Sequence, residues 1–124
     1  MRCLIVDDSD HFLQAARQLL EGEGIAVVGM SSTGAGALER FDECRPDVIL
    51  VDIELGEESG FDLARRLAGS RPEEASKVIL ISAYSEDDVA DVIVQGSALA
   101  FLPKSGLSAG AIRDILRRAG RDDV

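Results

Sequence analysis

The chain has 124 residues, of which 46% are hydrophobic and 4% aromatic, and its formal net charge is −10 at pH 7. This length suits one domain with its own core, so we expect residues 1–124 to fold as a single domain. The negative charge argues against direct nucleic-acid binding, which needs a basic surface, and no apolar stretch approaches the roughly 18 residues that span a bilayer. No signal-peptide pattern is present, and two cysteines are too few for a disulfide framework. We therefore expect a cytoplasmic protein that contacts neither nucleic acid nor membrane.

Segments with the pattern of strands alternate with segments with the pattern of helices along the chain. Strands are expected at residues 2–6, 25–30, 47–52, 77–82 and 98–102. Helices are expected at residues 10–22, 34–44, 60–69, 86–95 and 108–119. This alternation is typical of a parallel sheet whose strands are joined by crossover helices. It predicts an α/β fold with a single, doubly wound, five-stranded parallel sheet.

Apolar residues at helical spacing predict which face of each helix is buried. In the first helix the stripe consists of Phe12, Ala16, Leu19 and Leu20. The corresponding residues of the second, third and last helices are Leu38, Phe41, Phe61, Leu63, Ala64, Leu67, Ile112, Ile115, Leu116 and Ala119.

Polar residues follow four of the predicted strands, at the point where each strand ends. They are Asp7 and Asp8, Asp52, Ser82 and Lys104. Because parallel strands all point the same way, these side chains should converge on one edge of the sheet. Taken singly, each has an ordinary explanation as a helix cap, a turn residue or a solvated surface group. Together, in this order, they predict a site.

The predicted cluster has a charge imbalance, because three carboxylates and one ammonium leave a net charge of about −2. A hard dication that prefers oxygen ligands, Mg²⁺ above all, would neutralise it. If Asp52 became an aspartyl phosphate, its charge would change from −1 to about −2. Mg²⁺ and Lys104 would offset this added charge, and Ser82 would donate a hydrogen bond to a phosphoryl oxygen. The cluster therefore indicates phosphoryl chemistry.

The chain resembles the receiver domain of two-component response regulators along essentially its whole length. The matching motifs are Val6-Asp7-Asp8-Ser9, Pro46-Asp47-Val48-Ile49-Leu50-Val51-Asp52-Ile53, Gly60-Phe61-Asp62-Leu63, Ile81-Ser82-Ala83 and Phe101-Leu102-Pro103-Lys104-Ser105. The resemblance implies that residues 1–124 form a receiver domain with a flavodoxin-like sheet of strand order 2-1-3-4-5.

The resemblance also assigns roles to individual residues. It implies that Asp52 is the phosphoacceptor and that Asp7, Asp8 and Asp52 hold Mg²⁺ with the backbone carbonyl of Glu54. Ser82 and Lys104 would contact the phosphoryl group, and a sensor histidine kinase would donate it. Ser82 and Phe101 would form a conformational switch.

Several residues depart from the family pattern. Gly56 stands where the family often has proline, so the loop from Glu54 to Ser59 is expected to be looser. Ser105 replaces the proline that commonly follows the lysine, where the family often has a cis bond. Phe101 replaces a switch tyrosine and so lacks a hydroxyl. Glu54 and Tyr84 flank the site and would hinder the water that hydrolyses the phosphoryl group.

Other classes of protein fit less well. Asp8-Ser9-Asp10 after a strand also fits the nucleophile motif of haloacid-dehalogenase-type phosphatases, but those need a longer chain and a second acidic pair late in the sequence. A flavodoxin would need a Ser/Thr/Gly-rich phosphate loop after the first strand, where this chain is acidic. A pseudo-receiver that only binds partners would not need to keep all five site residues.

The output of the predicted receiver is left open by the sequence. The chain is either a stand-alone receiver that acts on a downstream protein partner or the receiver fragment of a DNA-binding transcriptional regulator with an attached output domain. Signalling, or formation of a homodimer, is expected through the face made by the fourth helix, fifth strand and fifth helix. The fourth helix offers Val89, Val92, Ile93 and Val94 there.

Overall fold

Five parallel strands form the sheet at the centre of the computed structural model, which describes residues 1–70, 78–83 and 100–122. The sheet strands are β1 (Arg2–Val6), β2 (Ala26–Ser31), β3 (Val48–Asp52), β6 (Val78–Ser82) and β7 (Ala100–Pro103). They lie in the order β2-β1-β3-β6-β7, and every neighbouring pair is parallel. Counted within this sheet the order is 2-1-3-4-5, so the predicted fold class and topology are confirmed.

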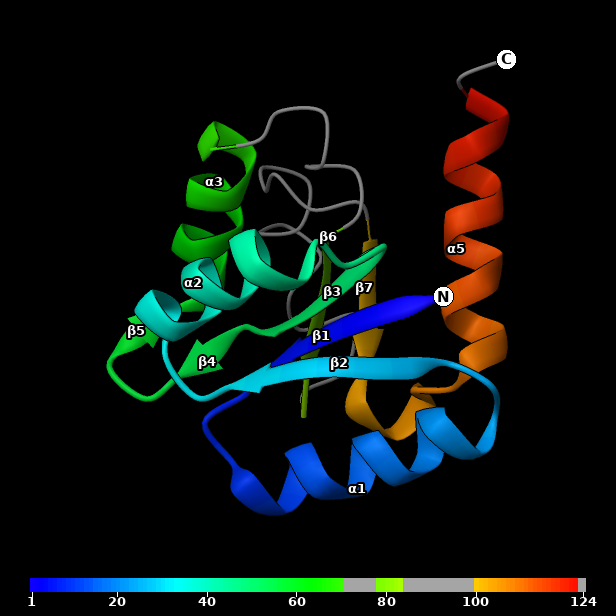
Figure 1. Cartoon of the computed structure of the whole chain (residues 1–124), viewed down its shortest axis with the longest axis horizontal. Coiled ribbons are helices and arrows are strands. Elements are labelled where there is room, and N and C mark those ends of the chain that lie inside the picture. The colour runs from blue at the N-terminus through cyan, green and yellow to red at the C-terminus, as the bar shows by residue number, and fades with distance from the viewer. Residues whose placement is uncertain (71–77, 84–99, 123–124) are drawn as a thin grey trace.

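Helices cover both faces of the sheet (Figure 1). They are α1 (Asp10–Gly22), α2 (Gly34–Cys44), α3 (Gly60–Ser70) and α5 (Ala109–Asp122). Figure 1 shows α1 and α5 on one side of the strands and α2 and α3 on the other. A short 3₁₀ helix, η2 (Lys104–Gly106), connects β7 to α5. The predicted helix at 86–95, with Val89, Val92, Ile93 and Val94, lies outside the described residues.

Two hydrophobic cores result from this layering, because successive strand residues point to opposite faces. In β1, Cys3 and Ile5 belong to the core under α1 and α5, whereas Leu4 and Val6 belong to the core under α2 and α3. All four are fully buried, as are the apolar residues of β3. Near-continuous apolar strands of this kind are expected when helices cover both faces.

The buried face of α1 differs from the predicted stripe. Leu13, Ala16 and Leu20 are buried, whereas Leu19 is 42% exposed and Phe12 is only half-buried. Ser9 caps this helix, since its side chain accepts a hydrogen bond from the Phe12 backbone N–H and fixes where the first turn begins. Phe12 is thereby directed toward the carboxyl ends of the strands instead of the centre of the core.

A small antiparallel ribbon follows β3, where a looser loop was expected. Its strands are β4 (Glu54–Leu55) and β5 (Glu58–Ser59). Gly56 adopts a φ of +63°, which a glycine reaches at no steric cost, and this closes the turn between them. Leu55 is buried, and both carboxylate oxygens of Glu58 accept from the Gly34 N–H at the start of α2, at 3.1 and 3.2 Å. Each strand of the ribbon is therefore held next to the turn, one by burial of Leu55 and the other by the Glu58 hydrogen bonds.

Both cysteines are free thiols, as expected. Cys3 is completely buried in β1, and burial raises the pKa of its thiol to about 12. Cys44 ends α2 and is half-buried, with its Sγ 3.5 Å from the Val28 carbonyl oxygen. Within the described part of the chain, no helix is long and apolar enough to cross a membrane.

The backbone of Gly60 lies very close to the backbone of Asp52 and Ile53 at the end of β3. Its N–H donates to the Ile53 carbonyl at 2.8 Å, and a Cβ would overlap the Asp52 carbonyl oxygen and lie 2.8 Å from the Ile53 Cα. We predict that Gly60→Ala lowers the free energy of unfolding by about 2 kcal/mol or more, since backbone must move. Urea denaturation measures it.

Gly22→Ala is the matched control, because a Cβ there meets nothing within 4 Å. It should leave stability unchanged or raise it by up to about 1 kcal/mol through better helix propensity. Equal effects of the two substitutions would contradict the close approach at Gly60.

Candidate functional site

A hollow lies at the carboxyl ends of the central strands, where the sequence predicted the site. Its lining residues come from the ends of β3, β6 and β7, from the start of α1 and from the ribbon after β3: Asp8, Asp52, Glu54, Gly56, Ser82, Ala83 and Lys104. Asp7 lies beneath it at the end of β1. The residues meet here because β1, β3, β6 and β7 are neighbouring parallel strands and all end on this side.

Three carboxylates form the acidic part of the site. Asp7 is fully buried, Asp52 is 5% exposed and Asp8 is exposed. One oxygen of each buried carboxylate accepts a backbone hydrogen bond: Asp7 Oδ1 from the Ser9 N–H at 2.8 Å and Asp52 Oδ1 from the Glu54 N–H at 3.2 Å. These bonds fix both side chains and direct the second oxygen of each toward Lys104.

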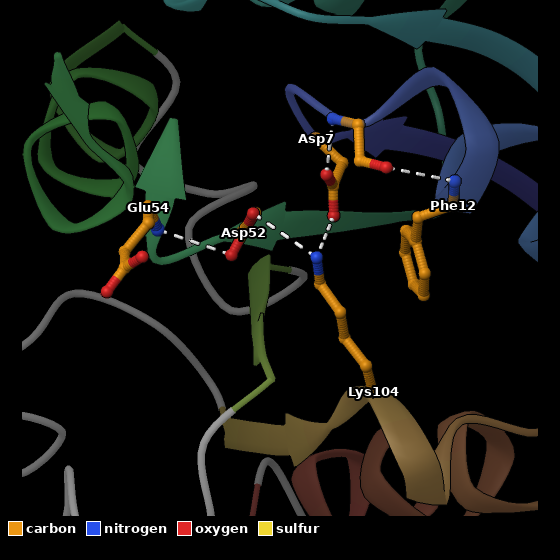
Figure 2. Close-up of polar contacts among 6 residues, drawn as sticks. Asp7, Phe12, Asp52, Glu54 and Lys104 are labelled. Carbon is orange, nitrogen blue, oxygen red and sulfur yellow. Dashed lines mark hydrogen bonds and ion pairs between the residues drawn. The ribbon is translucent and has the colours of Figure 1, made fainter. Parts of the chain in front are cut away.

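Lys104 joins the two buried carboxylates (Figure 2). Its Nζ lies 2.6 Å from Asp7 Oδ2 and 3.4 Å from Asp52 Oδ2. The same ammonium lies 4.4 Å from the centre of the Phe12 ring. Lys104 is the first residue of η2, and no described peptide bond is cis, including the one to Ser105. The lysine therefore reaches the site without the cis bond that is often found in the family.

The site shifts the pKa values of its own groups. Burial, followed by the negative charge of Asp7, raises the pKa of Asp52 to about 6, although the Glu54 N–H and Lys104 act in the opposite direction. Burial alone would lower the pKa of Lys104, but its hydrogen bond and charge interaction with Asp7 and its pairing with Asp52 raise it overall. The hydrogen bond from Glu54 and the charge of Lys104 therefore do not fully compensate the negative charge of the Asp52 carboxylate.

The three carboxylates suit a small, hard cation. Asp7, Asp8 and Asp52 each offer an oxygen, and these oxygens all lie within 4.8 Å of one another. In an octahedral Mg²⁺ site with ligands at about 2.1 Å, opposite ligands lie roughly 4.2 Å apart. The oxygens are therefore close enough to converge on one ion after small side-chain movements, and carboxylates are the ligands it prefers.

The structure brings together most of the residues that the sequence singled out. Asp7, Asp8, Asp52, Glu54, Ser82 and Lys104 all lie at or directly beneath the hollow, and Ser82 is 1% exposed at its edge. Phe101 does not line the hollow, because its side chain is buried in the core under α2 and α3. Tyr84 lies outside the described residues.

One contact of the site was missed from the sequence. Phe12 was assigned to the core, against whose edge it does pack, but its ring also lies against Lys104. The signal that could have revealed it is its position three residues after the capping Ser9, at the end of the helix nearest the site.

The order of the sheet defines a flavodoxin-like α/β domain, and an acidic crevice lies at the carboxyl edge of its strands. Residues 3–117 match the family described as the response regulator receiver domain. The chain therefore belongs to the receiver domains of two-component response regulators. The match does not support the alternative of a haloacid-dehalogenase-type phosphatase.

Curated relatives agree with this family. The chain is 34% identical to a protein-glutamate methylesterase/protein-glutamine glutaminase of Alkalilimnicola ehrlichii, over 84% of this chain and 27% of that protein. It is 29% identical to the response regulator GacA of Pseudomonas viridiflava, over 93% of this chain and 53% of GacA. The chain thus spans between about a quarter and about half of the length of these relatives.

Solved structures agree as well. A response regulator receiver domain protein from Clostridium thermocellum superposes with a TM-score of 0.77 at 27% identity, covering 96% of both chains. The response regulator domain of Thermotoga maritima CheB gives a TM-score of 0.73 at 26% identity, covering 98% of this chain and 92% of that one.

The raised pKa of Asp52 predicts how stability depends on pH in Mg²⁺-free buffer. The pKa is about 6 in the folded state against 3.8 ordinarily, so the folded state binds this proton more tightly than the unfolded state does. Above about pH 6 the charged Asp52 lowers the free energy of unfolding by up to about 3 kcal/mol. This penalty decreases as the pH falls from 6 to 3.8 and is absent at lower pH.

Asp52→Asn cannot titrate and is the comparison. It should be more stable than the wild type at pH 7.5 and lose that advantage by pH 4, as measured by urea denaturation with a chelator present. A difference between the two proteins that does not change with pH would contradict the shifted pKa.

Proposed function

We propose that this receiver accepts a phosphoryl group on Asp52 from a sensor histidine kinase in a Mg²⁺-dependent reaction. A carboxylate oxygen of Asp52 attacks phosphorus, the bond from phosphorus to the kinase's histidine nitrogen breaks, and that nitrogen keeps the electron pair. The observation that supports this most directly is the placement of Asp52. It lies in the hollow with two further carboxylates within 4.8 Å and an ammonium at 3.4 Å.

Each neighbour of Asp52 has a proposed part in the transfer. Asp7 and Asp8, with the backbone carbonyl of Glu54, hold Mg²⁺, which supplies positive charge to the transferring phosphoryl oxygens. Lys104 is already paired with Asp52 and turns its ammonium to the new phosphoryl group, whose charge of about −2 replaces −1. Ser82, at the end of β6, donates its hydroxyl hydrogen to a phosphoryl oxygen.

The domain acts on its own side chain and, in this proposal, is not an enzyme for a separate substrate. It assists both the arrival of the phosphoryl group and its later hydrolysis. Glu54 is exposed at the rim of the hollow, where its side chain can obstruct the attacking water. We propose the cytoplasm as the place where donor and receiver meet.

The signal is proposed to leave through the last two strands of the sheet. The phosphoryl group would pull Ser82, which ends β6, and Lys104, which follows β7. These strands pair with Leu80 opposite Phe101 and Ser82 opposite Pro103. Phe101 is buried in this structure, with 8% exposure, so a shift of Ser82 would change the space around it. A homodimer or an attached output domain would then respond on the adjoining face.

Phosphorylation of Asp52 is the first test. Incubation with acetyl phosphate and Mg²⁺ should add one phosphoryl group to the wild type, because the donor supplies phosphorus to the same carboxylate without a kinase. Intact-mass spectrometry measures it. Asp52→Asn should take up none, whereas Asp114→Asn, a change on the exposed surface of α5, should behave as the wild type. Equal uptake by all three proteins would refute the assignment of Asp52.

Mg²⁺ binding is the second test. Mg²⁺ at 100 times its dissociation constant should raise the free energy of unfolding by about 2.7 kcal/mol, since it binds only the folded cluster. Asp8→Ala should remove most of this gain. Asp10→Asn is the matched control, because Asp10 is an acid two residues away that is not among the clustered carboxylates. A wild-type melting temperature that saturating Mg²⁺ leaves unchanged would count against the site.

A further inference from the structure

We propose that Phe12 is a positioning residue, whose ring face holds the ammonium of Lys104 beside the phosphoacceptor. The inference deepens the proposed function, on which its kinetic consequence rests. Lys104 Nζ lies 4.4 Å from the centre of the Phe12 ring, within the range in which a cation is attracted to the negative face of an aromatic ring.

The ring contacts the ammonium on a side that Asp52 does not occupy. Figure 2 shows Lys104 rising between Asp52 on one side and the Phe12 ring on the other, with Asp7 above. The lysine side chain is only 20% exposed as a result. A lysine has four rotatable side-chain bonds, so contacts on both sides restrict where its charge can lie.

The contact belongs to a closed circuit of interactions that starts and ends at Asp7. Asp7 Oδ1 accepts from the Ser9 N–H at 2.8 Å, and Ser9 Oγ accepts from the Phe12 N–H at 3.2 Å. The Phe12 ring contacts Lys104, and Lys104 Nζ returns to Asp7 Oδ2 at 2.6 Å. The carboxylate that pairs with the ammonium therefore also fixes the first turn of α1, and with it the ring.

Core packing alone does not account for Phe12. The buried face of α1 is made by Leu13, Ala16 and Leu20, and Phe12 is half-buried at its edge, where it packs against the core and also contacts Lys104. A leucine would fill the apolar part of that space equally well, but it has no negative face to offer a cation. The two roles can therefore be separated by changing the electrons of the ring while its shape is kept.

Fluorination of the ring provides that separation. Phenylalanine with one, two or three ring fluorines is incorporated at position 12, and the initial rate of phosphoryl uptake from acetyl phosphate at saturating Mg²⁺ is followed by intact mass. Each fluorine weakens the ring's attraction for a cation, so the rate should fall stepwise, to about 2- to 5-fold below the wild type for the trifluoro ring. Phe12→Tyr should keep the wild-type rate, and Phe12→Leu should lose as much as the trifluoro ring.

The same fluorinated series at Phe61 is the matched control. Phe61 is a half-buried aromatic on α3, packed against the other core. Its series should give a constant rate. A constant rate across the series at position 12, or the same decline at position 61, would overturn the inference.

A second measurement needs no phosphorylation and keeps the two proposals distinguishable. In the Mg²⁺-free wild type, the ring current of Phe12 should shift the Lys104 Hε proton resonances upfield, and Phe12→Leu should abolish this shift while Phe12→Tyr retains it. Unshifted Hε resonances in the wild type would overturn the inference about Phe12. If the shift is present but the wild type takes up no phosphoryl group on Asp52, the positioning contact stands and the proposed function fails.

Discussion

Asp7 and Asp52 are held together against their mutual repulsion, and much of the domain maintains that arrangement. Two such charges about 4 Å apart repel by roughly 4 kcal/mol at an effective dielectric of 20. Asp7 follows β1 and Asp52 ends β3, and these strands pair in register with Val6 opposite Val51, so the two backbone positions cannot separate without breaking the centre of the sheet. Burial first, and then the negative charge of Asp7, raise the pKa of Asp52 to about 6, and the Glu54 N–H and Lys104 offset these two effects only in part. The remaining imbalance is what makes the site attractive to a cation.

Much of this arrangement could be predicted from the sequence, for a physical reason. Parallel strands covered on both faces are almost entirely apolar, so the first polar residue after each strand marks where the strand ends. Asp7, Asp52 and Ser82 all occupy such positions, and a parallel sheet has only one edge at which they can meet. Strand order came from the family resemblance, since periodicity does not determine which strands are neighbours.

The errors arose where a local interaction decided between nearly equal patterns. Phe12 and Leu13 are adjacent apolar residues, and helical periodicity accepts either one; in the structure Leu13 is buried in the core and Phe12 lies at its edge. The ribbon after β3 depends on the Glu58 carboxylate meeting the Gly34 N–H, two groups 24 residues apart. The spacing of residues in the sequence does not predict such a contact. A glycine at position 56 therefore suggested looseness, although its positive φ closes a turn.

Because Cys3 is completely buried, its reaction with a thiol reagent reports unfolding of the domain. A thiol reagent reacts with the thiolate form of cysteine. Cys3 is completely buried and its thiol has a pKa of about 12, so in the folded protein it does not react. The Cys44 side chain, at the end of α2, is partly exposed to solvent and can react. Labelling at Cys44 would record the native protein, and labelling at Cys3 would record molecules in which β1 has left the sheet. The ratio of the Cys3 adduct to the Cys44 adduct over time then measures the rate of unfolding without an engineered probe.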